Sequence, residues 1–182
     1  ADLVEVDWEP LAAVCDVRDA VKPGAPQLHP EAPGNLVVRF QRGSEAATQA
    51  AFQNAKHVVA VDLVNHRIAC AAIEPRAVIA IASPDRGLDG HELVIYSATQ
   101  VPHHIRKFVS EQLGLPENSV RVIAPDVGGG FGTKGKHYPE EIVLAWATRK
   151  LRRPLKWIST RSEAFISDYQ ARDHATRAEL AL

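Results

Sequence analysis

The sequence predicts a mixed α/β fold of the α+β type, in which a mixed β-sheet packs against helices. Several short apolar runs are bounded by glycine, proline, asparagine or aspartate, which is typical of strands. Two longer segments carry apolar residues at helical spacing. Strands and helices alternate irregularly along the chain, so a purely parallel sheet is not expected. The composition, 46% hydrophobic and 24% charged, is typical of a globular protein.

The N-terminal part is expected to contain two strands, a long loop and a helix. Residues 3–8 alternate apolar and polar side chains, which predicts a strand. Residues 22–34 hold four prolines and two glycines and are expected to form an extended surface loop. Residues 35–41 read as the second strand. Ser44 then offers its hydroxyl to the first turn of a helix that runs to about Ala55.

The middle of the chain is predicted to hold a β-hairpin. Two apolar stretches, residues 57–63 and 68–73, precede it. The hairpin strands are expected at residues 78–83 and 92–98. They are joined by a segment rich in turn-forming residues, residues 84–90.

A helix, a strand and a second helix follow. Apolar residues recur at helical spacing over residues 103–113, and Gly114 supplies a helix stop. A strand at residues 120–124 leads into a glycine-rich stretch. Pro139 suits the first turn of the next helix, which is expected to end near a basic run, residues 149–153, that complements the helix dipole.

Two further strands are predicted at residues 155–159 and 175–182. The chain has no methionine, and its first and last residues fall inside predicted strands. We therefore expect an internal fragment of a longer protein, folded as a single unit over residues 1–182.

Charge and hydropathy limit the classes of partner. The formal net charge is −1, so the chain lacks the basic surface that nucleic acid or an anionic membrane requires. No apolar run approaches the ~20 residues of a membrane span, and no signal-peptide pattern is present. A cytoplasmic location is expected.

Several reactive side chains are expected to have structural roles only. Cys15 and Cys70 lie in apolar runs and are interpreted as small buried hydrophobes, forming neither a disulfide nor a metal site. The adjacent His103 and His104 would point about 100° apart on a helix and cannot both face one metal, so they are expected to be surface or packing residues. No direct metal ligand is predicted.

The glycine-rich stretch allows three interpretations from the residues alone. Residues 130–135 match the dinucleotide fingerprint GxGxxG, with Arg161 available for a 2′-phosphate, which suggests an NADP-binding oxidoreductase domain using Gly130, Gly132 and Gly135. Residues 130–136 nearly match a phosphate-binding loop, but His137 replaces the magnesium-binding Ser or Thr. A flexible turn is the third interpretation.

A resemblance is more specific than any of these. The motifs Ser97-Ala-Thr-Gln100, Val127-Gly-Gly-Gly-Phe-Gly-Thr-Lys134 and Arg161-Ser-Glu-Ala-Phe165 resemble the large subunit of the molybdenum hydroxylases. That family includes xanthine dehydrogenase, aldehyde oxidase and aerobic carbon monoxide dehydrogenase. The similarity extends end to end through further motifs in the expected order, which are residues 6–11, 29–34, 73–76, 102–103 and 172–174.

The resemblance implies a fragment of the molybdopterin-binding region and names its site residues. Gln100 would lie close to a terminal oxygen ligand of molybdenum and act in catalysis. The backbone of Gly129, Gly130, Phe131 and Gly132 would lie against the cofactor, since glycines admit close approach of a bulky anionic group.

The resemblance also implies a cofactor, partners and a reaction. The cofactor would be a molybdenum-pyranopterin, in the dinucleotide form typical of bacterial members. Iron–sulfur clusters and FAD would be carried by partner subunits or domains and would receive the electrons. The reaction would oxidise a small substrate of the aldehyde, heteroaromatic or carbon monoxide type with oxygen taken from water. A non-catalytic assembly module remains the alternative from another class.

Three positions refine the expected site. Gly135 stands where xanthine-type members carry a glutamate that orients a purine, so the sequence is nearer the carbon monoxide dehydrogenase-like branch. Arg172 matches an arginine that faces the substrate pocket in some members. Glu74 and Arg76, on either side of Pro75, are expected to form a structural ion pair or turn.

Overall fold

The computed structural model describes residues 5–83, 87 and 89–182. Contacts group the chain into two compact units. The first unit contains the residues up to His66 together with Arg172–Leu182, and the second contains Arg67–Ala171. The single unit expected over residues 1–182 stays a prediction.

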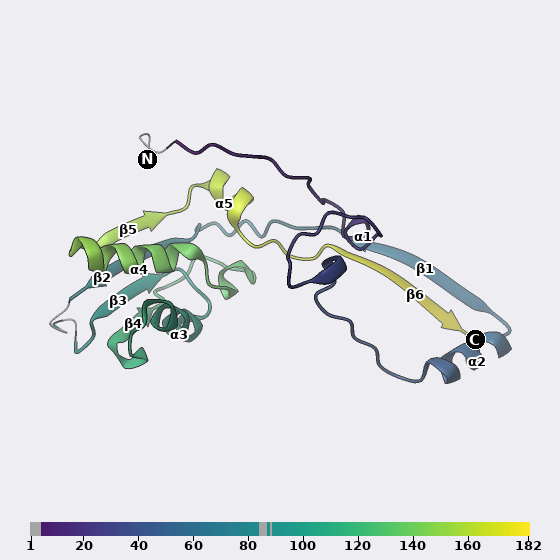
Figure 1. Cartoon of the computed structure of the whole chain (residues 1–182). Coiled ribbons are helices and arrows are strands. Elements are labelled where there is room, and N and C mark those ends of the chain that lie inside the picture. The colour runs from purple at the N-terminus through teal and green to yellow at the C-terminus, as the bar shows by residue number, and fades with distance from the viewer. Residues whose placement is uncertain (1–4, 84–86, 88) are drawn as a thin grey trace. The chain divides into compact units, whose positions relative to one another are not determined.

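The first unit is built on a two-stranded antiparallel ribbon. Strand β1 pairs with β6 along its whole length, from Val58 opposite Ala181 to Asn65 opposite His174 (Figure 1). The helices and strands described in this unit are α1 (Val17–Ala20), the short 3-10 helix η1 (Pro33–Asn35), α2 (Glu45–Asn54), β1 (Val58–Asn65) and β6 (His174–Ala181).

This unit has little core of its own. All eight residues of β1 are exposed, and no residue of α2 is buried. Among the described residues of the unit, Ala32 is the only hydrophobic residue in the buried class. The two strands are therefore held by their backbone ladder rather than by packing against another layer.

The second unit contains a four-stranded mixed sheet in the order β4-β3-β2-β5. Its strands are β2 (Ala77–Ala82), β3 (Leu93–Ser97), β4 (Val120–Ile123) and β5 (Leu155–Ile158). Strand β2 pairs antiparallel with both β3 and β5, whereas β3 and β4 are parallel. The predicted mixed α/β fold is confirmed.

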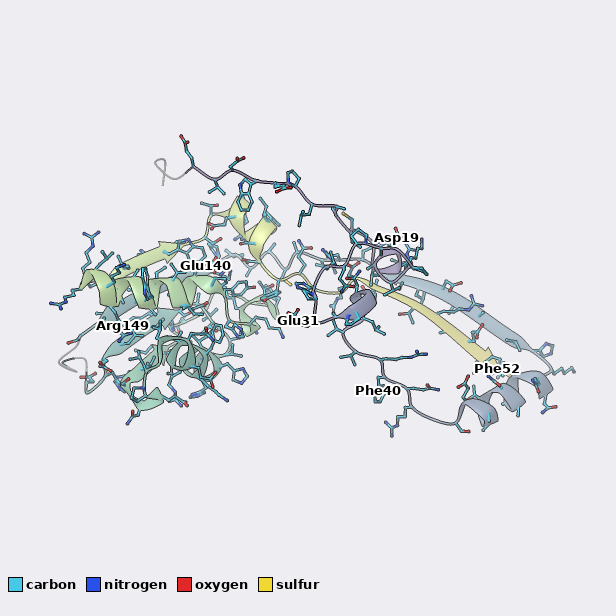
Figure 2. All side chains as sticks on the ribbon, in the orientation of Figure 1. Asp19, Glu31, Phe40, Phe52, Glu140 and Arg149 are labelled. Atoms are coloured by element: carbon cyan, nitrogen blue, oxygen red, sulfur yellow. The ribbon has the colours of Figure 1, made fainter. Side chains whose placement is uncertain are left out.

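Helices α3 (Pro102–Leu113) and α4 (Pro139–Leu151) pack together on the sheet (Figure 1). The core between them and the sheet includes Leu93, Ile95 and Ile105, each fully buried. Labelled side chains near opposite ends of α4 carry opposite charges, since Glu140 lies in its first turn and Arg149 in its last (Figure 2). This arrangement complements the helix dipole, as the sequence predicted.

The predictions of two N-terminal strands and of a buried Cys15 are wrong. Residues 36–41 form no strand, and Phe40 is 82% exposed (Figure 2). Of the strand predicted at residues 3–8, residues 5–8 have no regular structure, and residues 3 and 4 lie outside the described part. Alternation alone does not make a strand, because a strand also needs a partner edge. Cys15 is exposed rather than buried, and Cys70 is partly buried.

The remaining long elements agree with the sequence. The hairpin of β2 and β3, both helices and strands β4, β5 and β6 lie within a few residues of their predicted bounds. Gly114 ends α3 in the left-handed conformation, with φ 62°. The predicted turn at residues 84–90 lies partly outside the described residues. Helix α5 (Arg161–Ser167) was missed, although Thr160 and Glu163 form a capping box at its start.

Candidate functional site

The candidate site lies at one edge of the four-stranded sheet. Strands β3 and β4 are parallel and adjacent, joined through α3, so their carboxyl ends meet at the same edge. Gln100 follows the end of β3. The glycine loop, defined as residues 127–132, follows the end of β4. Loops after the carboxyl ends of adjacent parallel strands are a usual place for ligand sites in α/β folds.

Gln100 and the glycine loop are in direct contact. The Oε1 atom of Gln100 accepts a hydrogen bond of 3.1 Å from the N–H of Gly132. A backbone N–H can only donate, so this contact fixes which end of the amide faces the loop. The Nε2 donors of Gln100 have no acceptor among the described residues. The side chain is exposed, and its NH₂ group is the end that a ligand can meet.

Glycine is favoured at these loop positions for different physical reasons. A Cβ on Gly130 would lie 2.5 Å from Oε1 of Gln100, so a side chain there would displace the Gln100 amide from its contact with the loop. Gly129 and Gly132 adopt φ values of 92° and 89°, which side chains disfavour. The predicted site residues of the second unit are thus brought together by the fold.

Phe131 stands out within the loop. Its φ of 50° is a left-handed conformation, which is uncommon for a bulky residue and marks local strain. The residue is 72% exposed. The N–H groups of Gly130 and Phe131 donate no hydrogen bond within the described residues. The loop therefore offers consecutive backbone donors beside the Gln100 amide.

A second layer of contacts holds the residues that follow the loop. Thr133 and Lys134 lie in a buried 3-10 turn, η3 (Thr133–Gly135). The carbonyl of Lys134 accepts hydrogen bonds from the Gln100 N–H at 2.9 Å and from the Thr99 hydroxyl at 3.2 Å. The Tyr138 hydroxyl donates to the Thr133 carbonyl at 2.9 Å. Gln100 is thereby fixed at its backbone as well as at its side chain.

Glu74 reaches the loop from the segment before β2. Its carboxylate accepts hydrogen bonds from the Gly128 N–H at 2.8 Å and from the Lys134 ammonium at 2.6 Å. Burial alone would raise the pKa of the Glu74 carboxyl. The two hydrogen bonds and the charge of Lys134 outweigh burial and hold that pKa below its ordinary value. The carboxylate is therefore ionised at neutral pH.

The predicted pairing of Glu74 with Arg76 is wrong. Arg76 is buried and forms ion pairs with Glu140 at 2.9 Å and Asp168 at 2.6 Å, which link β2 to both ends of the α4–α5 region. Residues two apart in an extended segment usually point to the same side. Pro75 lies between Glu74 and Arg76 and fixes its own φ, so the two side chains need not face the same partner. Sequence reasoning also missed Lys134 and Thr99, because their contacts depend on pairing between distant segments.

The contacts of Arg161 count against the NADP-binding alternative. Its guanidinium donates to the carbonyls of Ala72 and Ile73, at 2.6 and 2.8 Å, so it is engaged by the backbone. The residues after Gly132 form the short turn η3, and α4 begins only at Pro139. A dinucleotide fingerprint requires an α-helix that opens on the glycines.

The remaining predicted site residue, Arg172, belongs to the first unit, directly before β6. It is exposed and has a φ of 74°. Its role in a substrate pocket stays a prediction.

No three side chains of His, Cys, Asp or Glu in residues 5–83, 87 and 89–182 gather in a way that could hold a metal ion. No helix in this part of the chain has the length and apolar character needed to cross a membrane.

Comparison with known proteins gives a consistent match. Residues 28–182 match the family described as the molybdopterin cofactor-binding domain. The chain is 34% identical to the carbon monoxide dehydrogenase large chain of Hydrogenophaga pseudoflava, over 99% of this chain and 23% of that protein. It is 36% identical to the 6-hydroxypseudooxynicotine dehydrogenase complex subunit gamma of Paenarthrobacter nicotinovorans, over 100% of this chain and 22% of that protein.

A solved structure agrees with these relatives. The reconstituted carbon monoxide dehydrogenase from Oligotropha carboxidovorans superposes with a TM-score of 0.85 at 33% identity, over 99% of this chain and 23% of that chain. The chain thus spans about a quarter of the length of the proteins that it matches.

Proposed function

We propose a function from the premise that this chain belongs to the molybdopterin cofactor-binding domain family of the molybdenum hydroxylases, whose members named above are oxidoreductases. In this proposal the chain supplies one wall of the cofactor site of a molybdenum-dependent oxidoreductase. The observation that carries it is the group of donors at the glycine loop, namely the Gln100 amide and the N–H groups of Gly130 and Phe131.

The residues present fit a bulky anionic cofactor. A side chain at Gly130 would displace the Gln100 amide, and side chains at Gly129 and Gly132 are disfavoured by their φ values, so the loop presents backbone rather than Cβ atoms. Neutral N–H donors on a strained, fixed backbone suit the oxygen-rich groups of a pyranopterin. The Gly129–Gly132 backbone and Gln100 would hold the cofactor.

The chemistry divides between the cofactor and the chain. When bound, a molybdenum-pyranopterin supplies transfer of water-derived oxygen to a substrate and accepts the two electrons released. The chain's own contribution is an amide NH₂ that donates without adding charge and whose direction is set by the Gly132 N–H. Such a preorganised donor stabilises negative charge that develops during a reaction, at no cost of reorientation.

The substrate class in this proposal is a small aldehyde, a heteroaromatic compound or carbon monoxide. Two relatives support it by name, a carbon monoxide dehydrogenase and a nicotine 6-hydroxylase large subunit. A Cβ on Gly135 would meet nothing within 4 Å, so packing does not forbid a side chain there. The position that would carry a purine-orienting glutamate is nevertheless bare, which disfavours purines.

The remaining parts of the proposal concern the whole protein. The cofactor would be in the dinucleotide form, and electrons would pass to iron–sulfur clusters and FAD on partner subunits or domains. A cytoplasmic location and a role for Arg172 in the substrate pocket complete it. A relative named as one subunit of a complex, and others named as large subunits, support the presence of partner chains.

The test is Gln100→Ala in the full-length parent protein. Turnover per bound molybdenum should fall by about 10²-fold, because one preorganised donor is lost. Turnover is followed by dye reduction with carbon monoxide, aldehydes and N-heteroaromatic compounds, and molybdenum and pterin are quantified in each preparation.

Gln112→Ala is the matched control, since that glutamine is exposed on α3 and does not touch the loop. It should leave turnover unchanged. Normal turnover of a fully loaded Gln100→Ala protein, or a parent protein purified without molybdenum and pterin, would refute the proposed function.

A further inference from the structure

The Glu74–Lys134 ion pair connects both ends of the glycine loop. Glu74 lies before β2, in a segment that is distant in sequence from the loop. Its backbone N–H donates to the Gly128 carbonyl at 3.2 Å, and its carboxylate accepts from the Gly128 N–H at 2.8 Å. The same carboxylate oxygen accepts from the Lys134 ammonium at 2.6 Å. One glutamate thus holds Gly128, the first glycine of the loop, and Lys134, two residues beyond its end.

Lys134 is unusual for a lysine because its side chain is only 2% exposed. A buried ammonium is costly unless it is paired and hydrogen-bonded. Glu74 is its ion-pair partner among the described residues, with a carboxylate that is 35% exposed. The charge of Glu74 therefore compensates the buried Lys134 ammonium.

The backbone of Lys134 carries the connection to Gln100. Its carbonyl accepts the Gln100 N–H at 2.9 Å, while the Gln100 side chain accepts from Gly132 at 3.1 Å. A movement of Lys134 would shift the frame in which the Gln100 amide is oriented. The contacts run from Glu74 through Lys134 to the donor group of the proposed site.

Gly128 supports the same arrangement. A Cβ at this position would lie 2.6 Å from the Cβ of Glu74, which is closer than real Cβ atoms approach each other. Gly128 also has no positive φ that would demand glycine. The first glycine of the run is thus required by its contact with Glu74, whereas a side chain at Gly130 would displace the Gln100 amide.

We infer that Glu74 and Lys134 are positioning residues, which clamp the glycine loop and the backbone of Gln100 into the geometry that receives the cofactor. The inference rests on the proposed function for the identity of the ligand, but the clamp itself is a property of the chain. Neither side chain touches the reacting atoms. Their effect is on the order of the loop and on the direction of the Gln100 donors.

The experiment uses the full-length parent protein with Glu74→Gln, Lys134→Met and the double variant. Hydrogen–deuterium exchange of peptides covering residues 127–134 is measured in cofactor-free protein. Molybdenum content and turnover per bound molybdenum are measured in loaded protein. Glu117→Gln is the control, because it removes a carboxylate from the Arg106–Glu117 pair, which lies on α3 and η2 (Glu117–Ser119) away from the loop.

Glu74→Gln leaves the buried Lys134 without its counter-charge. The hydrogen-bonded loop amides, such as those of Gly128 and Gly132, should then exchange about tenfold faster. Turnover per molybdenum should fall by a similar factor, which corresponds to ~1.4 kcal/mol, because the Gln100 donors are less well oriented. The double variant should recover most of both losses, because no buried charge remains unpaired and the Gln side chain still accepts from Gly128. Glu117→Gln should match the wild type in loop exchange.

Four outcomes would overturn the inference. They are wild-type loop exchange in Glu74→Gln, equal loss of protection in peptides throughout the second unit, failure of Glu74→Gln to fold, and a double variant no better than the single ones. If the wild-type parent protein never contains molybdenum, but the variants show the expected changes in loop exchange, the clamp is supported and the proposed function is refuted. If the wild-type protein contains molybdenum and is active, but the variants match it in loop exchange and turnover, the proposed function is supported and the clamp is refuted.

Discussion

The two units of this chain use opposite means to stay ordered. The second unit encloses a core of fully buried residues such as Leu93, Ile95 and Ile105 between its sheet and two helices. The first unit has a long strand ladder whose apolar side chains, such as Val59 and Leu180, are each 58% exposed. One unit is stabilised by apolar burial, and the other depends on backbone hydrogen bonds.

This difference indicates where precise geometry can be maintained. A strained Phe131 and a fixed Gln100 amide persist only where the surrounding structure determines them. The glycine loop and Gln100 belong to the unit that has a core, and they follow the ends of its strands β4 and β3. The ribbon of β1 and β6 offers no comparable support, since bare two-stranded ribbons are only marginally stable in water.

The largest expected effect tests the core of the second unit. Ile95→Ala removes a fully buried side chain from β3 and should lower the local free energy of unfolding by about 3 kcal/mol. Amides of β2 and β3 in the parent protein should then exchange about 10²-fold faster, at ~1.36 kcal/mol per factor of ten. Hydrogen–deuterium exchange measures this.

Ile158→Ala is the matched control, because Ile158 is 50% exposed on the neighbouring strand β5 of the same sheet. It should change exchange far less. Equal effects of the two substitutions would mean that the core does not stabilise this unit in the way described.

An intermediate effect concerns a charge buried in this unit. Burial of Glu141 raises the pKa of its carboxyl above 4.5, although hydrogen bonds from Tyr138 and Ser97 oppose the shift. The folded state binds its proton more tightly than the unfolded state, so wild-type stability falls as pH rises through the raised pKa. Glu141→Gln should therefore stabilise the unit at pH above that window and lose its advantage as pH falls toward 4.5.

Protection factors of amides in the first turns of α4, measured at several pH values, test this expectation. Glu140→Gln is a control of opposite sign. Burial would raise the pKa of Glu140, but hydrogen bonds and the charge of Arg76 lower it overall, so its carboxylate stabilises the fold at neutral pH. Glu140→Gln should therefore reduce stability most at pH values where the Glu140 carboxyl is ionised in the wild type. Parallel pH profiles for the two variants would contradict the analysis.

The smallest expected effect tests the ribbon. Val61 on β1 is 46% exposed, so Val61→Thr should change stability by less than ~1 kcal/mol, as is usual for surface positions. Exchange of β1 and β6 amides in the parent protein is the measurement. A loss as large as that of Ile95→Ala would break the comparison, because it would mean that the ribbon is packed against residues outside the described chain.

Much of the second unit could be predicted because its signals are local. Apolar spacing and Gly114 define α3, Pro139 opens α4, and turn residues separate β2 from β3. The first unit was harder, since residues 35–41 alternate like a strand but have no partner edge to pair with. Whether an alternating segment pairs depends on the tertiary structure rather than on the segment itself.

The contact between Gln100 and the glycine loop could be anticipated, although their role as a site stays a prediction. The motif that contains Gln100 and the glycine loop could be recognised in the sequence, and the fold brings them into contact. The partners of Glu74 could not be predicted, because its contacts with Gly128 and Lys134 join segments far apart in sequence. Spacing suggested Arg76 instead, and that side chain turns to Glu140 and Asp168.

The pairing of β1 with β6 has a consequence for synthesis of the chain. Asp62 on β1 pairs with Arg177 on β6, and 115 residues of sequence separate the two. At ~5–20 residues per second, the ribosome needs roughly ten seconds to deliver the partner strand. During that interval a valine-rich strand has an open edge, which favours association with other nascent chains. The second unit lies entirely within this interval and can fold before the ribbon closes. The open edge of β1 is therefore closed only after the whole second unit has been synthesised.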